Sequence, residues 1–122
     1  RYWQLEKGGT WDKGKSFPTF NPMGPWVDTS DELNPQNLRV SCSVNGKKRQ
    51  DSNTDDMIFA IPTLVHYVSQ CMELFPGDII NTGTPAGVAM GMNPQQYLVA
   101  GDVVETSIES LGTIRNSCVA AS

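Results

Sequence analysis

Alternating apolar positions predict that the middle of the chain forms a β-hairpin. The stretch 38–44 places its apolar residues on one face of an extended chain, at Leu38, Val40, Cys42 and Val44. Asn45 and Gly46 follow at once, and this dipeptide is the strongest short-range signal for a hairpin turn. The return strand is therefore expected to begin within residues 47–50.

A period close to that of an α-helix replaces the alternation in residues 61–75. The apolar positions with helical spacing there are Ile61, Leu64, Val65, Val68 and Met72. Pro62 suits the first turn, where its missing N–H costs no hydrogen bond, and the Pro-Gly-Asp at 76–78 predicts the helix end. We therefore expect one short helix near 61–74, followed by a short strand at 78–82.

The two ends of the chain differ in pattern. Residues 101–120 predict two strands joined by a turn at 110–112, and imperfect alternation there leaves room for a bulge. Residues 1–26 are rich in Gly, Trp, Lys and Pro and have no clean period, which predicts a loop with short extended pieces. The whole pattern predicts a mainly β domain without internal repeats.

Composition and charge narrow the classes of partner. The 122 residues allow one domain at most, and 39% hydrophobic and 18% charged residues are ordinary for a soluble globular protein. The net charge is −4, and the one basic cluster, residues 46–49, is short and typical of a solvated hairpin tip. These features argue against a nucleic-acid or membrane partner, and no apolar run approaches the roughly 20 residues of a membrane helix.

The cysteines and the first residue bear on the cellular setting. Cys42, Cys71 and Cys118 form no CxxC pair, which argues against a structural zinc site and favours reduced thiols in a cytoplasmic protein. No secretory signal pattern is present. The sequence begins at Arg1 rather than at Met, inside an apparent element, so we expect an N-terminal portion to be missing.

The Thr-Gly-Thr-Pro segment at 82–85 is a candidate binding loop. It lacks the Gly-Lys-Ser/Thr ending of a phosphate loop, and no helical pattern follows it. A plain turn is one interpretation. In the other, Gly83 lets a ligand approach the backbone, and the hydroxyls of Thr82 and Thr84 beside exposed N–H groups bind a carboxylate.

One lysine stands apart from the other polar residues. Lys15 lies between Gly14 and Ser16 in a Gly- and Pro-rich loop, where it could donate to an enolate or a carboxylate; an ordinary surface lysine is the alternative. His66 is interpreted as a helix-surface histidine. The acidic stretches 28–32 and 51–56 read as loops and helix caps without the spacing of a calcium loop.

Several short blocks, taken together and in order, resemble the C-terminal half of the fumarylacetoacetate hydrolase family. The blocks are GKSF, GPW, PQNL, VNG, QDSNTDDMIF, PGD, TGTPAGV and GDVVE. No single block is specific, but the ordered set is, and it covers essentially the whole chain. The opening residues look most like bacterial acylpyruvate-type hydrolases, including diketo-deoxy-sugar-acid hydrolases, or ureidoglycolate lyases.

The resemblance implies a fold and an activity. The expected fold is α+β, mainly β: a mixed β-sandwich roll, usually a homodimer, with residues 1–122 as part of the catalytic domain. The expected reaction is metal-dependent hydrolysis of a C–C bond in a 2,4-dioxo acid, with Mg²⁺ or Mn²⁺ on carboxylates and an enolate leaving group. An isomerase, hydratase or decarboxylase of the same superfamily and a non-catalytic scaffold remain alternatives.

The resemblance also assigns roles to positions in this sequence. The catalytic positions fall on Lys15, Gln4 and Arg1. The substrate-binding positions fall on Thr84, Gly83 and Thr82. Thr19 takes the place of a threonine in the outer shell of the metal. The family's metal-binding carboxylates and its Glu–His pair lie upstream of Arg1, so this chain alone is expected to bind no metal tightly.

Overall fold

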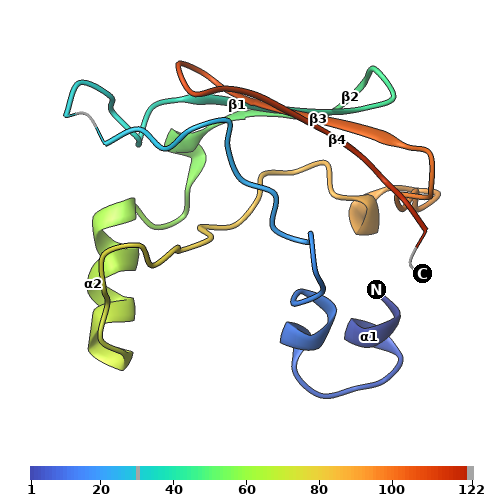
Figure 1. Ribbon diagram of the computed structural model, residues 1–122, viewed down its shortest axis with the longest axis horizontal. Helices are drawn as coiled ribbons and strands as arrows, with labels where there is room; N and C mark the ends of the chain where they lie inside the picture. Colours follow the sequence, from blue (N-terminus) through green and yellow to red (C-terminus); the bar gives the residue numbers. More distant parts are fainter. Residues whose placement is uncertain (30, 121–122) are drawn as a thin grey trace.

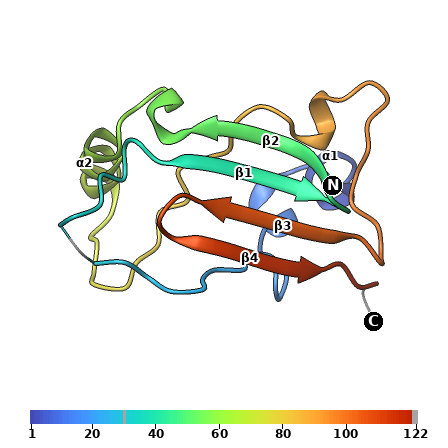
Figure 2. The same cartoon turned by 90° about the horizontal axis from the view of Figure 1, so that it is seen from above.

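The computed structural model describes residues 1–29 and 31–120. Its elements, in chain order, are α1 (Tyr2–Leu5), η1 (Trp11–Gly14), β1 (Arg39–Val44), β2 (Lys47–Asn53), η2 (Thr54–Asp56), α2 (Ile61–Cys71), η3 (Ala89–Gly91), β3 (Val103–Ile108) and β4 (Gly112–Ser117). The four strands form one layer, and α1 and α2 lie on the same side of it, at opposite ends (Figures 1 and 2). None of the described helices is long and apolar enough to cross a membrane.

The sheet is antiparallel, with the strand order β2-β1-β3-β4. The hairpin predicted at Asn45 and Gly46 is confirmed: both residues have positive φ, 51° and 75°, and Val44 pairs with Lys47 across the turn. A two-residue turn of this kind needs positive φ at both central positions, which Asn and Gly tolerate. β2 continues to Asn53, so residues 51–53, which were expected to lie in a loop, belong to the strand.

A β-bulge interrupts the pairing of β1 with β2. Cys42 faces Gln50 and Ser43 faces Lys48, so Arg49 is the extra residue. In contrast, the β3–β4 register runs without a shift from Val103 to Ile108, and the bulge considered for residues 101–120 is absent there. The turn expected at 110–112 is confirmed, with β3 ending at Ile108 and β4 beginning at Gly112.

Two predicted elements differ in the structure. The helix begins at Ile61 as expected but ends at Cys71, because Met72 is extended (φ −153°, ψ 152°) and 60% exposed, so that no packing sustains another turn. The Pro-Gly-Asp at 76–78 therefore does not end it. The strand expected at 78–82 does not form: this stretch joins no ladder in the described sheet, and Ile79 is 55% exposed.

The N-terminal region also differs from its prediction. Instead of short extended pieces, it holds the single helical turns α1 and η1, which pack against each other. The contact is close at Gly14, where a Cβ would stand 2.4 Å from Cγ of Gln4. Helices of four residues are too short to display a hydrophobic period, which explains why the sequence pattern did not indicate them.

The two faces of the sheet carry different side chains. The face without helices in Figure 1 is polar, with paired side chains Arg39–Asp51 at 3.0 Å, Arg115–Glu105 at 3.4 Å and Ser107–Thr113 at 2.5 Å. The opposite face presents apolar residues such as Val40 and Ile108 to the loops beneath. An antiparallel sheet with one polar face and one apolar face is the expected consequence of alternation.

The described core is small for a chain of this length. Among the described residues, the buried apolar side chain is that of Leu38, which is 7% exposed. The buried polar side chain is that of Gln4, which is 8% exposed. The accessible surface is 9615 Å². A compact monomer of this mass has about 6,500 Å². The chain therefore leaves uncovered apolar surface that a compact domain would bury.

Candidate substrate-binding site

A cavity of about 440 Å³ lies between the inner face of the sheet and the loop that follows α2. Residues 82–84 of that loop form one wall. The other walls combine apolar side chains, among them Ile58, Leu64, Val40 and Ile108, with polar ones from the end of β2 and from η2, namely Ser52, Asn53, Thr54 and Asp56. The structure thus places the Thr-Gly-Thr segment at the rim of a partly apolar cavity, while its role in binding substrate stays a prediction.

The side chain of Gln50 holds this loop to the edge strand β2. Its Nε2 donates to Oγ1 of Thr84 at 2.8 Å and to the carbonyl oxygen of Pro85 at 2.9 Å. Gln50 reaches the loop because it points to the inner face, one residue after the bulged Arg49. The free edge of the sheet is covered where the loop passes (Figure 2).

Two glycines give the loop its shape. Gly87 has φ 105°, and its backbone lies so close to β2 that only a residue without a Cβ fits there. Gly83 has φ 109°, and a Cβ added to it would meet no atom within 4 Å. Gly87 therefore fixes the loop to the sheet, whereas Gly83 leaves the backbone beside Thr82 and Thr84 open to a ligand.

The three predicted catalytic residues belong to one small unit at the N-terminus. Nη1 of Arg1 donates to Oε1 of Gln4 at 2.6 Å, and the guanidinium lies 5.4 Å from the ring centroid of Trp11. Lys15 follows η1 directly, and its N–H donates to the carbonyl of Asp12 at 2.9 Å. Its side chain is exposed. The structure brings Arg1 and Gln4 into contact and leaves the Lys15 ammonium available.

The two halves of the predicted site are not joined by this cavity. Of the described residues that line it, none is Arg1, Gln4, Lys15 or Thr19. Thr19 is exposed and has φ 67°, an uncommon value for a residue with a branched side chain. The roles assigned to these residues therefore stay predictions.

The described residues do not fit a divalent cation. Among them, no group of three His, Cys, Asp or Glu side chains lies close enough to hold one. Two of the carboxylates already accept hydrogen bonds from other side chains. Those from Arg39 and Lys48 hold the pKa of Asp51 well below its usual range. The hydroxyl of Thr10 likewise lowers the pKa of Asp12. Thr19, the residue predicted for the outer shell of the metal, offers only a neutral hydroxyl oxygen.

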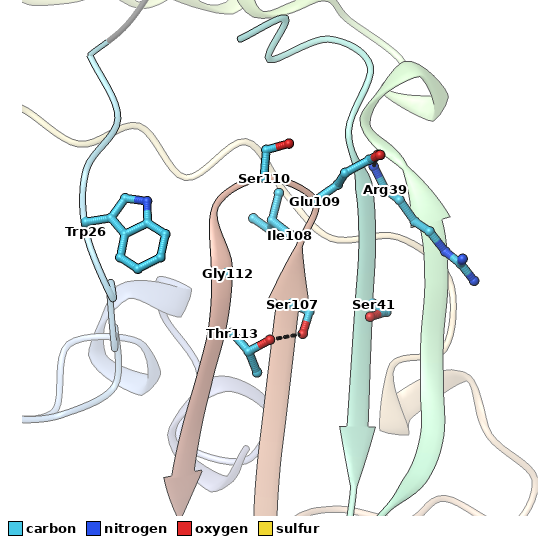
Figure 3. A pocket seen from close by; sticks show the side chains of 9 residues that line it. All are labelled: Trp26, Arg39, Ser41, Ser107, Ile108, Glu109, Ser110, Gly112 and Thr113. Carbon is cyan, nitrogen blue, oxygen red and sulfur yellow. Dashed lines mark hydrogen bonds between the residues drawn. The ribbon is translucent and has the colours of Figure 1, made fainter.

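A larger, open depression of about 590 Å³ lies on the outer face, beside the β3–β4 turn (Figure 3). Several of its polar side chains already have partners. Ser107 and Thr113 share a hydrogen bond, and the Arg39 guanidinium binds Asp51 instead of pointing into the hollow. Trp26 contributes the aromatic surface. We therefore regard the cavity under the Thr-Gly-Thr loop as the candidate site.

Two further residues of the site were not predicted from the sequence. Gln50 belongs to the block QDSNTDDMIF and Gly87 to the block TGTPAGV; the sequence indicates a turn for Gly87 together with Gly83 and Pro85, but no contact between Gly87 or Gln50 and the rest of the site. The signal that points to Gln50 is its inward position on β2, which requires the bulge to be known. His66 is exposed on α2, as expected for a surface residue, and its Nε2 lies 3.0 Å from Nε2 of Gln70.

Comparison with known proteins gives a consistent result over nearly the whole chain. A family model described as fumarylacetoacetate (FAA) hydrolase C-terminal matches residues 1–119. A Burkholderia multivorans protein, named no more specifically than hydrolase, is 52% identical over 114 residues, which are 92% of this chain. The chain spans about 40% of the length of the curated relatives it matches.

Solved structures show the same fold. Fumarylacetoacetate hydrolase from Exiguobacterium antarcticum is 43% identical, with a TM-score of 0.85 over 89% of this chain and 39% of its own. The 2-hydroxyhepta-2,4-diene-1,7-dioate isomerase from Mycobacterium marinum is 37% identical, with a TM-score of 0.83 over 95% of this chain and 42% of its own. Maleylpyruvate hydrolase from Sphingobium sp. SYK-6, in complex with manganese (II) ion and pyruvate, is 38% identical, with a TM-score of 0.74 over 83% of this chain and 36% of its own. These similarities confirm the predicted fold class.

Proposed function

The chain belongs to the fumarylacetoacetate hydrolase family, and from this premise we propose that it is part of an enzyme that hydrolyses a C–C bond in a 2,4-dioxo acid. The observation that carries the proposal is the cavity whose rim is the Thr82–Gly83–Thr84 wall. Its hydroxyl and open backbone suit a carboxylate, and its apolar walls suit the carbon chain of an acylpyruvate. The maleylpyruvate hydrolase with bound pyruvate supports this class of substrate.

The residues of this chain have distinct parts in the proposed reaction. Thr84 donates a hydrogen bond to the substrate carboxylate, and Gly83 lets that carboxylate approach the backbone. Water adds to the distal carbonyl, and the C–C bond breaks to give a carboxylic acid and the enolate of a 2-oxo acid. Lys15 does not line this cavity, so its part rests on the family resemblance: we assign to its ammonium the stabilisation of the negative charge that develops on the enolate oxygen. Arg1 and Gln4, joined by their hydrogen bond, orient the substrate beside it.

The metal is assigned to groups outside the described residues. The described residues present no group of three His, Cys, Asp or Glu side chains that could hold the ion. We propose that Mg²⁺ or Mn²⁺, when bound, is held by carboxylates elsewhere in the whole protein and supplies Lewis-acid polarisation. The manganese in the maleylpyruvate hydrolase complex supports the use of a divalent ion.

Assembly and location are proposals of the same kind. We propose a homodimer in which a second copy, together with the rest of the whole protein, covers exposed apolar side chains such as Val27, which is 85% exposed. The three free thiols, Cys42, Cys71 and Cys118, support a cytoplasmic protein.

The isomerase from Mycobacterium marinum makes isomerisation the second candidate activity, and hydration, decarboxylation or a non-catalytic scaffold are further alternatives. The test is incubation of the full-length protein with acetylpyruvate and Mn²⁺, followed by proton NMR. A hydrolase releases acetate and pyruvate in equal amounts. A decarboxylase that forms an enolate needs a carboxyl group β to a carbonyl, so it would leave acetylpyruvate intact and convert oxaloacetate to pyruvate. Turnover of a hydroxymuconate-type diacid without a change of mass would favour the isomerase, and no turnover of any of these substrates would favour the scaffold.

A further inference from the structure

We propose that Gln50 is a positioning residue that fixes the direction of the hydrogen bond made by Thr84. The inference rests on the proposed function, in which Thr84 binds a substrate carboxylate, and adds a residue to it. Gln50 is half-buried on the edge strand β2, and its amide contacts both Thr84 and Pro85 of the loop. It is thus the side chain through which β2 holds the rim of the cavity.

The chemistry of the contact fixes which group donates. The carbonyl oxygen of Pro85 can only accept, so the amide atom 2.9 Å from it must be the nitrogen of Gln50. The same nitrogen lies 2.8 Å from Oγ1 of Thr84. An amide nitrogen has two protons and no lone pair to offer, so the Thr84 hydroxyl is the acceptor there.

This direction leaves the single proton of the Thr84 hydroxyl free for another partner. A threonine hydroxyl that accepts from an amide still has its own O–H to donate. Thr84 lines the cavity, so the proton is available to a ligand in it. The ligand that best complements such a donor is an acceptor without protons, namely a carboxylate. Gln50 therefore favours the ionised acid end of the substrate over a neutral hydroxyl or amide.

Two neighbouring contacts keep Gln50 in place. The bulge at Arg49 puts the next residue, Gln50, against the loop, and the carbonyl of Arg49 lies against Gly87 on the other side of Pro85. Nη1 of Arg49 also approaches Sδ of Met92, at 3.3 Å. The loop is therefore held at three points along β2, and Gln50 is the one that contacts the ligand-binding hydroxyl.

A double-mutant cycle in the full-length enzyme tests the proposal. Gln50→Met, which keeps the length of the side chain and removes the donor, is expected to raise KM for acetylpyruvate by about 3- to 10-fold and to change kcat less. In a Thr84→Val background the same substitution should raise KM no further, because no hydroxyl is left to orient. In a Thr84→Ser background, which restores the hydroxyl, the effect of Gln50→Met should return.

A second variant keeps the test decisive if Gln50→Met folds poorly. Gln50→Glu keeps the shape of the side chain, but its carboxylate accepts the Thr84 proton and has no N–H for the carbonyl oxygen of Pro85, so we expect a larger rise in KM than with Gln50→Met, measured on protein whose circular dichroism spectrum matches that of the wild type. Equal effects of Gln50→Met with and without the Thr84 hydroxyl would overturn the proposal. A normal KM in Thr84→Val would instead refute the substrate-binding role of Thr84, which belongs to the proposed function.

Discussion

The backbone of Gly87 lies directly against the carbonyl group of Arg49: a Cβ on Gly87 would stand 2.0 Å from that oxygen. Such a separation is far inside van der Waals contact, and the obstacle is backbone rather than a flexible side chain. The contact exists because Arg49 is the bulged residue of β2, and a bulge displaces the backbone from the regular ladder. The candidate loop is therefore shaped by a defect in the neighbouring strand.

Gly87→Ala is expected to lower the free energy of unfolding of the full-length protein by at least about 2 kcal/mol. The new methyl group collides with Arg49, and the φ of 105° adds backbone strain for a residue with a Cβ. The same change should raise KM, because the loop that carries Thr84 must move. Urea denaturation and steady-state kinetics measure the two effects.

Gly83→Ala is the matched control for that substitution. Its φ of 109° is nearly the same, but the added Cβ would meet no atom within 4 Å. We expect a loss of about 1 kcal/mol from backbone strain alone. If both variants lose the same stability, the contact between Gly87 and Arg49 has no energetic role.

Asp51 is expected to make stability depend on pH at the acid end. Hydrogen bonds from Arg39 and Lys48 lower its pKa in the folded protein, so its contribution is present above the unfolded pKa, near 3.9, and is lost as the pH falls below that value. Asp51→Asn should therefore lower the melting temperature modestly at pH 7, and the difference from wild type should shrink below about pH 4. The difference should also shrink in high salt, because the pair is exposed.

Asp55→Asn provides the comparison for Asp51. Its carboxylate forms no ion pair within residues 1–29 and 31–120. Removal of its charge should change the melting temperature little, and equally at pH 3 and pH 7. A constant difference between wild type and Asp51→Asn over this range would show that the ion pairs of Asp51 do not stabilise the fold.

The elements that the sequence predicted correctly depend on local chemistry. The β1–β2 turn follows from the tolerance of Asn45 and Gly46 for positive φ, and the start of α2 follows from the helical period and Pro62. The end of α2 could not be derived in this way. It depends on whether another surface covers Met72, and in the described structure none does, so the apolar period outlasts the helix.

The candidate site was predictable only in part for a related reason. The residue types of the Thr-Gly-Thr loop predict a carboxylate site, but Gln50, which contacts the loop, precedes Thr84 by 34 residues in the sequence. That pairing depends on a one-residue bulge, and no periodicity in β2 marks the position of Arg49. A shift of one residue would turn Gln50 to the outer face, so contacts of this kind require the three-dimensional register.

Lys15→Met in the full-length enzyme is expected to lower kcat by about 100- to 1,000-fold, the range for loss of one donor to a developing oxyanion. KM should change less, because the enolate charge appears only as the C–C bond breaks. Stopped-flow or steady-state release of pyruvate gives both constants. Unchanged turnover would refute the catalytic role of Lys15.

Lys13→Met is the control for Lys15→Met, since the two residues carry the same charge and both are exposed. Lys13 lies within η1, whereas Lys15 follows it as the C-cap residue. Replacement of Lys13 should leave kcat and KM near the wild-type values. Equal losses in the two variants would indicate a general effect of positive charge instead of a specific role for Lys15.

The last prediction concerns metal binding by the 122-residue chain alone, which we expect to bind Mg²⁺ or Mn²⁺ no better than millimolar and to show no hydrolase activity. Mg²⁺ gives up its water reluctantly and normally needs one or two carboxylates. The described residues offer no suitable cluster; Lys15 is a cation, and Thr19 is neutral.

Isothermal titration of the isolated chain with Mn²⁺ measures this affinity, and the same titration of the full-length protein is the comparison. Two of the available carboxylates are already satisfied within the chain: Asp51 by Arg39 and Lys48, and Asp102 by Asn45 and the N–H of Val99. Metal binding would have to break these contacts, which adds to the energetic penalty of dehydrating the ion. A stoichiometric site of micromolar affinity on the isolated chain would contradict the assignment of the ligands to residues outside it, because the chain would then hold a metal centre of its own.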